Sequence, residues 1–219
     1  MVPPRGLEPS GIILVDKPAG PTSFAVVASV RRRTGARTGH AGTLDPFATG
    51  LLLLLSGTAT RLQPRFVGLD KQYVTEIDLS ARTSTGDPEG DVIEELEPPA
   101  PEELEERLIG LRGVVELPVP AASAVKIGGE RAYRLHRRGV AVEMPVRRMG
   151  VHELTLEAYA DGIARLDLNV SSGTYVRSIA NALGGHCRTL RRTEIGPFSV
   201  EEADPERIIP PKEALVRLP

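Results

Sequence analysis

The chain has 219 residues, of which 41% are hydrophobic, a formal net charge of −2 and a single cysteine. This length supports one large domain or two small ones with a buried core. One cysteine excludes an intrachain disulfide framework, and no Cys/His cluster has the spacing of zinc ligands, so we expect no metal site. No apolar run could span a bilayer and the N-terminus has no signal-peptide core, so we expect a cytoplasmic protein without membrane contact.

Basic and acidic residues are separated along the chain more than the net charge suggests. The acidic stretches are residues 87–106 and 201–206. If the basic clusters share one face, that face could neutralise the phosphates of a nucleic acid. The alternative is that they are ordinary solvated helix faces. The clustered arginines are Arg31, Arg32, Arg33 and Arg37, then Arg131, Arg134, Arg137 and Arg138, then Arg188, Arg191 and Arg192.

The N-terminal part reads as a tail, a strand and a helix. Residues 1–9 are rich in proline and polar groups, which predicts disorder. Residues 11–16 (G-I-I-L-V-D) have the pattern of a short buried strand. Thr22 or Ser23 can cap a following helix that runs to about Arg33 and ends at Gly35.

Residues 39–55, G-H-A-G-T-L-D-P-F-A-T-G-L-L-L-L-L, join a glycine-rich loop to an unbroken run of leucines. Because a residue before proline is pushed out of the helical region, Asp45 is expected on a defined, non-helical turn. The leucine run has the length of a fully buried strand, although periodicity alone does not distinguish it from a buried helix. Either element would anchor the acid to the core.

The motif G-H-A-G-T-L-D-P-F-A-T-G resembles the catalytic motif of the TruB family of pseudouridine synthases. Those enzymes isomerise a uridine in the T-loop of tRNA. The resemblance implies that Asp45 is the nucleophile and that His40 contacts the RNA where the uridine leaves its stack. The preceding segment I-L-V-D-K-P-A-G-P-T-S resembles another family motif, in which Lys17 and Pro18 would support the catalytic loop.

Residues 71–81 alternate as a half-buried strand does, with Tyr73 leading the inward face. The opening K-Q-Y resembles the family's K-x-Y motif. This implies that Tyr73 stacks on the target base and serves as a general base, whereas composition alone would favour an ordinary core tyrosine. The next segment, residues 82–91, is polar and turn-rich. It lacks the residue order of a calcium loop, so we reject metal binding there.

Residues 98–111 have the pattern of an acidic amphipathic helix, with Leu104, Leu108 and Leu111 on one face. Residues 116–133 then resemble a further family segment, which implies RNA contacts by Lys126, Arg131 and Tyr133 and by the basic helix that follows. Glu116 and Val119 depart from the family pattern, and one extra residue precedes Ser123. These departures affect only the local turn.

Residues 146–159 and 162–170 read as a strand pair joined by a tight turn. The segment S-S-G-T-Y-V-R-S-I-A-N-A-L-G-G then passes into a helix and resembles a family motif, with Ser172 and Ala182 in place of Lys and Asp. The resemblance implies that Arg177 pairs with Asp45. It covers about residues 11–203. We expect a catalytic domain over 10–205 and a short tail over 206–219, with no room for the additional C-terminal RNA-binding domain of most bacterial members.

The resemblance implies an α+β fold, a mixed and mainly antiparallel sheet flanked by helices, and the predicted mixture of strands and helices without a regular βαβ alternation is of the same class. It implies an isomerase that binds the T-loop and elbow of tRNA, flips a uridine out of the T-loop and needs no cofactor. We expect a monomer. Attack at C6, attack at C1′ and proton loss at C2′ all need the same carboxylate. Two rivals are an RNA chaperone with the same fold and a nucleotide-using enzyme; the second lacks both a P-loop and a G-x-G-x-x-G fingerprint.

Overall fold

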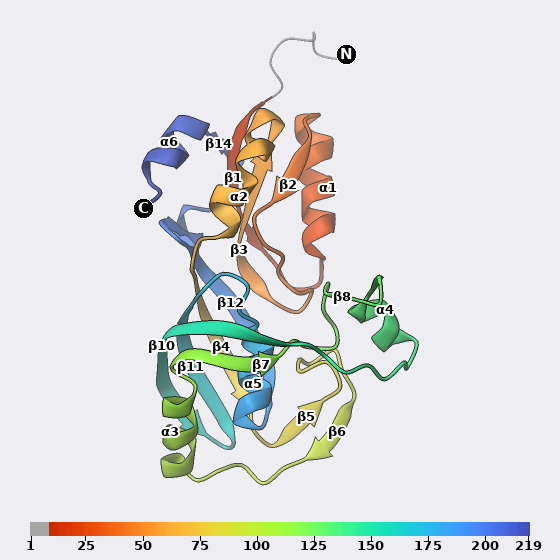
Figure 1. Cartoon of the computed structure of the whole chain (residues 1–219). Coiled ribbons are helices and arrows are strands. Elements are labelled where there is room, and N and C mark those ends of the chain that lie inside the picture. Colours follow the sequence, from red (N-terminus) through yellow and green to blue (C-terminus); the bar gives the residue numbers. More distant parts are fainter. Residues whose placement is uncertain (1–8) are drawn as a thin grey trace. The chain divides into compact units, whose positions relative to one another are not determined.

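The computed structural model describes residues 9–219, so most of the tail predicted over residues 1–9 lies outside the described residues. The chain divides into two compact units. Unit 1 is the described part of Met1–Tyr73 together with Arg191–Pro219, and unit 2 is Val74–Leu190. Both contain helices and mainly antiparallel strands (Figure 1), which confirms the predicted α+β class.

Unit 1 combines the two ends of the described chain in one sheet with helices on both sides. Its strand order is β14-β1-β3-β12, and β2 pairs with β3. Its elements are β1 (Gly11–Lys17), α1 (Ser23–Thr34), β2 (Thr38–His40), β3 (Thr49–Ser56), the 3-10 helix η1 (Gly57–Leu62), α2 (Gln63–Val67), β13 (Phe198–Ser199), the 3-10 helix η2 (Val200–Glu202), β14 (Asp204–Ile209) and α6 (Pro211–Val216).

The leucine run forms the central strand β3, so the strand alternative is confirmed. Its side chains alternate between two hydrophobic clusters. Leu51, Leu53 and Leu55 pack with Phe66 of α2, Phe198 and Ala214 of α6. Leu52 and Leu54 pack on the opposite face with Val30 of α1. A strand buried on both faces needs apolar residues at every position, which explains the unbroken run.

Helix α1 begins and ends as the sequence predicts. The Thr22 hydroxyl accepts a hydrogen bond from the Ala25 amide, and Gly35 closes the helix in the left-handed conformation with φ of 69°.

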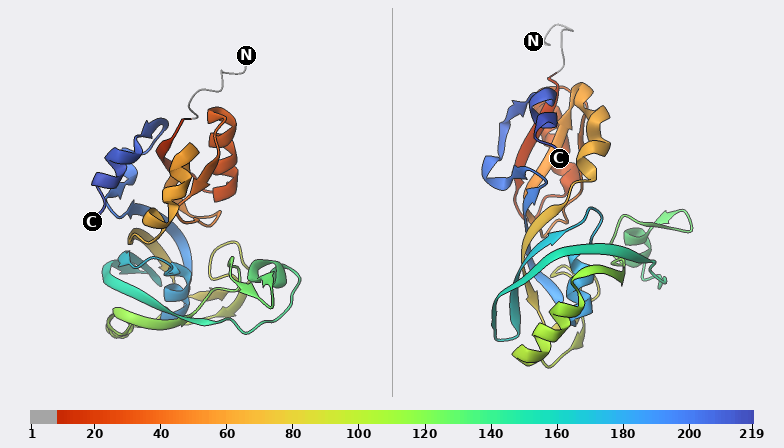
Figure 2. Two further views of the ribbon diagram at one scale, coloured as in Figure 1. Left: turned by 45° about the horizontal axis from the view of Figure 1, so that its top comes forward. Right: turned by 60° about the vertical axis from the view of Figure 1, so that its left-hand side comes forward.

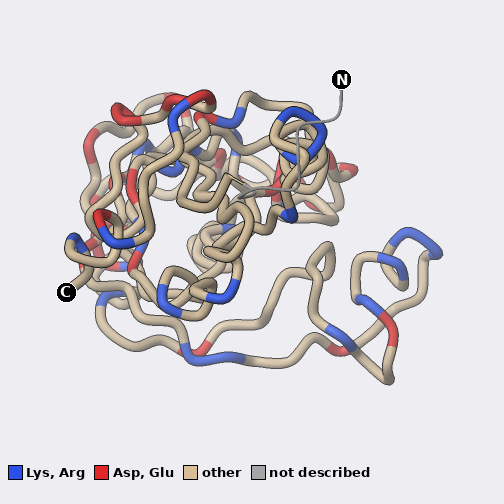
Figure 3. Tube along the Cα trace, turned by 90° about the horizontal axis from the view of Figure 1, so that it is seen from above, with Lys and Arg blue, Asp and Glu red and all other residues tan. Residues whose placement is uncertain are grey.

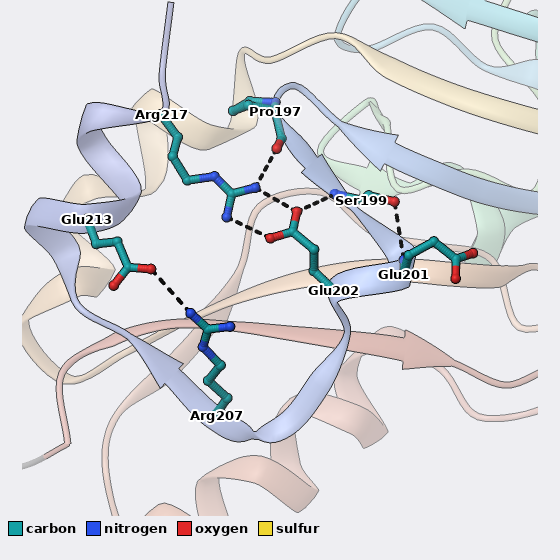
Figure 4. A network of polar contacts seen from close by, with 7 residues as sticks. All are labelled: Pro197, Ser199, Glu201, Glu202, Arg207, Glu213 and Arg217. Carbon is teal, nitrogen blue, oxygen red and sulfur yellow. Dashed lines mark hydrogen bonds and ion pairs between the residues drawn. The ribbon is translucent and has the colours of Figure 1, made fainter.

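The C-terminal segment is tied to unit 1 by charged contacts (Figure 4). The Arg217 guanidinium bonds both carboxylate oxygens of Glu202 and the Pro197 carbonyl, and it lies 4.3 Å from the Phe198 ring centroid. Strand β14 pairs antiparallel with β1. The predicted short tail, 206–219, therefore contains the end of β14 and all of α6.

Unit 2 contains a second set of strands in the order β12-β4-β11-β10-β7 and two separate hairpins, β5–β6 and β8–β9. β4 and β12 each contribute residues to both units. The elements are β4 (Lys71–Asp78), β5 (Ala81–Thr83), β6 (Val92–Glu95), α3 (Pro101–Gly110), β7 (Gly113–Pro118), β8 (Lys126–Ile127), β9 (Glu130–Arg131), α4 (Ala132–Arg137), β10 (Val146–Ala160), β11 (Ile163–Val170), α5 (Val176–Leu183) and β12 (His186–Ile195).

The predicted elements of unit 2 are also present. Strand β4 alternates between buried and half-buried residues, and β10 and β11 form the predicted hairpin, with Asp161 at a positive φ of 50° in its turn. Helix α3 buries Leu104 and Leu108 and contacts β10 and α5 (Figure 2). Within residues 9–219, no helix is long and apolar enough to cross a membrane.

Candidate active site

Asp45 lies on the loop between β2 and β3, where the backbone is neither helix nor strand. The Asp45 carbonyl accepts a hydrogen bond of 3.2 Å from the Ala48 amide, which closes a turn around Pro46. The side chain is half-buried. The expected non-helical turn is thus confirmed, and its conformation follows from the Asp-Pro step.

Lys17, at the end of β1, anchors this loop through hydrogen bonds. Its side chain is fully buried, and its ammonium donates to the carbonyls of Pro18 at 2.8 Å, Pro46 at 3.2 Å and Ala48 at 2.7 Å. A buried charge is tolerated when hydrogen bonds replace its hydration. Lys17 therefore supports the loop that carries Asp45, as the motif resemblance implies.

Arg192 holds the other side of the same loop from β12. Its buried guanidinium donates to the carbonyls of Leu51 at 2.7 Å, Gly42 at 3.2 Å and Thr43 at 3.3 Å. Gly50 has φ of 101°, and a Cβ there would lie 2.2 Å from the Arg192 carbonyl oxygen. Only glycine fits this approach. Arg192 consequently does not offer its charge to phosphates, unlike the role considered for its cluster.

A third anchor joins the loop to α1. The buried Ser23 hydroxyl donates to the Leu44 carbonyl and accepts from the Leu44 amide, both at 2.8 Å. Both polar groups of the residue before Asp45 are therefore satisfied by one side chain. Ser23 thus ties the first turn of α1 to the loop.

His40 ends β2 at the entrance to the loop. Its Nδ1 accepts from the Gly42 amide at 3.3 Å, and its carbonyl accepts from Gln63 at 2.8 Å. Burial, and after it the positive charge of Arg192, lowers the pKa of His40 below its ordinary value. The ring is accordingly neutral at pH 7, and it would meet RNA as a flat polar ring rather than as a cation.

Tyr73 occupies the buried face of β4, as the alternation predicts, and belongs to unit 1 with Asp45 and His40. Two residues earlier, Lys71 is also buried, and its ammonium donates to the carbonyls of Val67 at 2.7 Å and Leu69. Burial is the main cause that lowers the pKa of Lys71 to about 8.

Arg177 lies in the first turn of α5, in unit 2. The sequence did not predict its ion pair with Asp87. Its guanidinium is 3.2 Å from the Asp87 carboxylate, and the two side chains are only 3% and 4% exposed. It also donates to the carbonyls of Thr85 at 2.8 Å and Ala122 at 3.0 Å. Asp87 is itself fixed, because its second oxygen accepts from the Thr85 hydroxyl at 2.5 Å and the Glu89 amide at 3.0 Å.

Lys126, Arg131 and Tyr133, three of the four residues predicted to bind RNA, lie on the β8–β9 hairpin and α4, and the fourth, His40, ends β2. Figure 3 shows how Lys and Arg (blue) are distributed along the trace. Lys126 and Arg131 are exposed and Tyr133 is half-buried. Arg134 and Arg137 each lie 5.9 Å from the Tyr133 ring centroid, and Arg134 also donates to its hydroxyl at 3.3 Å. This element, residues 126–138, presents cations around one aromatic ring, an arrangement suited to a nucleic-acid strand.

The structure thus gathers the predicted residues in two sets. Asp45, His40 and Tyr73 belong to unit 1, whereas Arg177, Lys126, Arg131 and Tyr133 belong to unit 2. The pairing of Asp45 with Arg177 stays a prediction. Among residues 9–219, no three His, Cys, Asp or Glu side chains gather as metal ligands would.

Comparison with known proteins identifies the family of the chain. A model of the TruB family pseudouridylate synthase N-terminal domain matches residues 31–176. A tRNA pseudouridine synthase B of Leifsonia xyli subsp. xyli (strain CTCB07) is 43% identical over 227 aligned positions, covering 96% of this chain and 75% of that protein. Its counterpart in Thermobifida fusca (strain YX) is 44% identical, covering 88% and 72%.

Among solved structures, a crystal structure of a Cbf5-Nop10-Gar1 complex is similar, with a TM-score of 0.66 and 27% identity over 86% of this chain and 50% of that one. The family match covers more than half of the residues and includes Asp45, Tyr73 and Asp87. The chain belongs to the TruB family of pseudouridylate synthases.

Proposed function

We propose that this protein isomerises uridine to pseudouridine in the T-loop of tRNA, with Asp45 as the nucleophile and the target base turned out of its stack. The tRNA substrate is supported by relatives that are themselves named tRNA pseudouridine synthase B. The reaction class is supported by membership of the family. The T-loop and the role of Asp45 rest on the motif around Gly39–Gly50.

The observation that carries this proposal is the anchoring of the Asp45 loop. Three buried side chains, Lys17, Ser23 and Arg192, together donate to seven carbonyls and accept from one amide around it. Such anchoring keeps a carboxylate in place before substrate arrives, and that preorganisation is what a nucleophile needs. A purely structural Asp-Pro turn would not require buried cations on both sides.

The reaction needs little beyond this carboxylate. The bond between C1′ and N1 breaks, the uracil turns, and a bond forms between C1′ and C5. The C5 proton then leaves while N1 takes one up, so atoms balance without a redox partner or cofactor. Asp45 serves at C6, at C1′ or in proton loss at C2′, and Tyr73 stacks on the base and removes the C5 proton.

Arg177 supplies the cation that holds Asp45 ionised and aligned. A guanidinium has five N–H donors in a planar fork, enough to serve Asp87, two carbonyls and a second carboxylate. The buried Asp87 carboxylate fixes that fork. Asp87 is therefore a positioning residue for the reaction, acting through Arg177.

RNA binding is assigned to the element of residues 126–138 and to His40. Lys126 and Arg131 would neutralise phosphates, and Tyr133 would support them by stacking. The same basic element also favours the second candidate function, an RNA chaperone that binds tRNA with little catalysis. The two functions differ in whether pseudouridine forms in the tRNA.

The test is to incubate the purified protein with unmodified tRNA transcripts and map pseudouridine by mass spectrometry. The proposal expects one modified uridine, in the T-loop, and equal modification of an isolated T-arm hairpin. Modification only in another arm would overturn the T-loop assignment. Faster tRNA refolding with no pseudouridine in any transcript would favour the chaperone.

A further inference from the structure

Phe24 differs from the other phenylalanines of unit 1 in facing solvent. The chain has four phenylalanines and no tryptophan. Phe66 and Phe198 are fully buried and pack against each other at 5.9 Å. Phe24, in the first turn of α1, is 69% exposed. An exposed aromatic ring offers a face on which a nucleobase can stack.

The position of Phe24 is fixed relative to the Asp45 loop. Its ring meets the ring of His40 edge to face, with centroids 5.5 Å apart and planes at 84°. The adjacent Ser23 bonds both polar backbone groups of Leu44. The Phe24 ring therefore lies against His40, and its backbone adjoins the Ser23 anchor of the Asp45 loop.

The flank of α1 that carries Phe24 also carries a cation. Arg31 follows seven residues later, which is two turns or about 10 Å along the axis, on the same flank and exposed. A flat ring followed by a cation suits a single strand of RNA, whose bases stack on aromatic side chains while its phosphates meet arginines. The neutral His40 ring leaves stacking, rather than charge, as the attraction at this corner.

We propose that Phe24 and His40 form a two-ring platform, and that Phe24 stacks on the nucleobase next to the extruded uridine. This inference rests on the proposed function and names which part of the RNA this surface takes. Phe24 is a binding residue and takes no part in the chemistry. Its stacked base holds the neighbouring strand open while the uridine is at Asp45.

Substitution at residue 24 should separate stacking from simple apolar contact. Phe24→Ala should raise the Kd for a T-arm hairpin about tenfold, equivalent to about 1.4 kcal/mol. Phe24→Tyr should restore binding, whereas Phe24→Leu should not. Val216→Ala, at an 86% exposed apolar residue of α6, is the matched control and should bind as wild type does. Wild-type affinity in Phe24→Ala, or equal rescue by Leu and Tyr, would overturn the platform.

A fluorescence measurement tests the same contact without relying on turnover. Since the chain has no tryptophan, Phe24→Trp contains a single reporter at the proposed contact. Its emission should be quenched by a T-arm hairpin, and less so when the base beside the target uridine is replaced by an abasic site. Val216→Trp should show no quenching. Equal quenching with and without that base would contradict the inference. Wild-type protein that makes no pseudouridine would instead contradict the proposed function, while the quenching result would still decide on Phe24.

Discussion

The Asp87 and Arg177 pair offers a sharp test because removing one partner leaves a charge buried. Asp87→Asn keeps an oxygen that can accept from Thr85 and the Glu89 amide, but turns an NH2 group toward the guanidinium 3.2 Å away. Breaking a buried ion pair costs about 3–5 kcal/mol, and keeping the second oxygen places Asn at the lower end, about 3 kcal/mol. For a chain of this size the melting temperature should fall by about 6–12 °C.

The assay is urea unfolding followed by far-ultraviolet circular dichroism, since the chain has no tryptophan. The control is Glu94→Gln, which breaks the Arg82–Glu94 pair in the same unit, where the side chains are 44% and 50% exposed. Solvent screens that pair, so its loss should cost under about 1 kcal/mol. An equal loss in both variants would refute the reasoning from burial.

The same variant should lose activity beyond its loss of stability. Under the proposal that Arg177 aligns Asp45, the single-turnover rate should fall about 10- to 100-fold at a temperature where the variant is folded. The double variant Asp87→Asn with Arg177→Met should be less destabilised than the sum of the single variants, because no unpaired charge remains. Additive losses would show that the two side chains act separately.

Three further predictions concern the charged anchors of unit 1. Lys17→Met should lower the free energy of unfolding by about 2–4 kcal/mol, because it leaves the buried Ala48 carbonyl without this donor, and pseudouridine formation should fall more than tRNA binding. The pKa of Lys71 is about 8 in the folded protein, below its value in the unfolded chain. Because the unfolded chain therefore binds more protons from about pH 8 to 10, the stability of the wild type should rise with pH over that window. Lys71→Met should flatten this rise, as measured by urea midpoints. The hydrogen bond from Arg217 lowers the pKa of Glu202, so this pair contributes above the ordinary carboxylate range and its contribution is lost as pH falls through the folded pKa. Arg217→Gln should remove that pH dependence, at a cost of under about 1 kcal/mol at pH 7, as measured by thermal unfolding.

Local patterns in the sequence predicted β1 and α1 of unit 1 well, because those elements depend on neighbouring residues, but they did not predict β14 and α6. Thr22 and Gly35 fixed the ends of α1 through capping alone. The leucine run left strand and helix open, since the deciding fact is burial on both faces by α1, α2 and α6. Those helices come from other parts of the chain, so the pattern within the run does not reveal that they cover it.

The site was harder to predict where a residue acts through a distant partner. Asp87 lies in a polar turn whose composition resembles any surface loop, and its partner comes 90 residues later. The T-G-D-P-E-G stretch was the available signal, because a carboxylate that orders its own turn is suited to hold a guanidinium. Arg192 was grouped with surface arginines because sequence does not reveal that three carbonyls surround it.

The most direct test of the account is to replace the Asp45 carboxylate alone. Asp45→Asn should fold and bind tRNA as wild type does, yet release no tritium from a T-arm RNA labelled at C5 of its uridines. Asp16→Asn, which changes an exposed aspartate of the same unit that pairs with Arg191, should keep full activity. Turnover by Asp45→Asn comparable to that of Asp16→Asn would contradict the claim that this loop is built to hold a nucleophile.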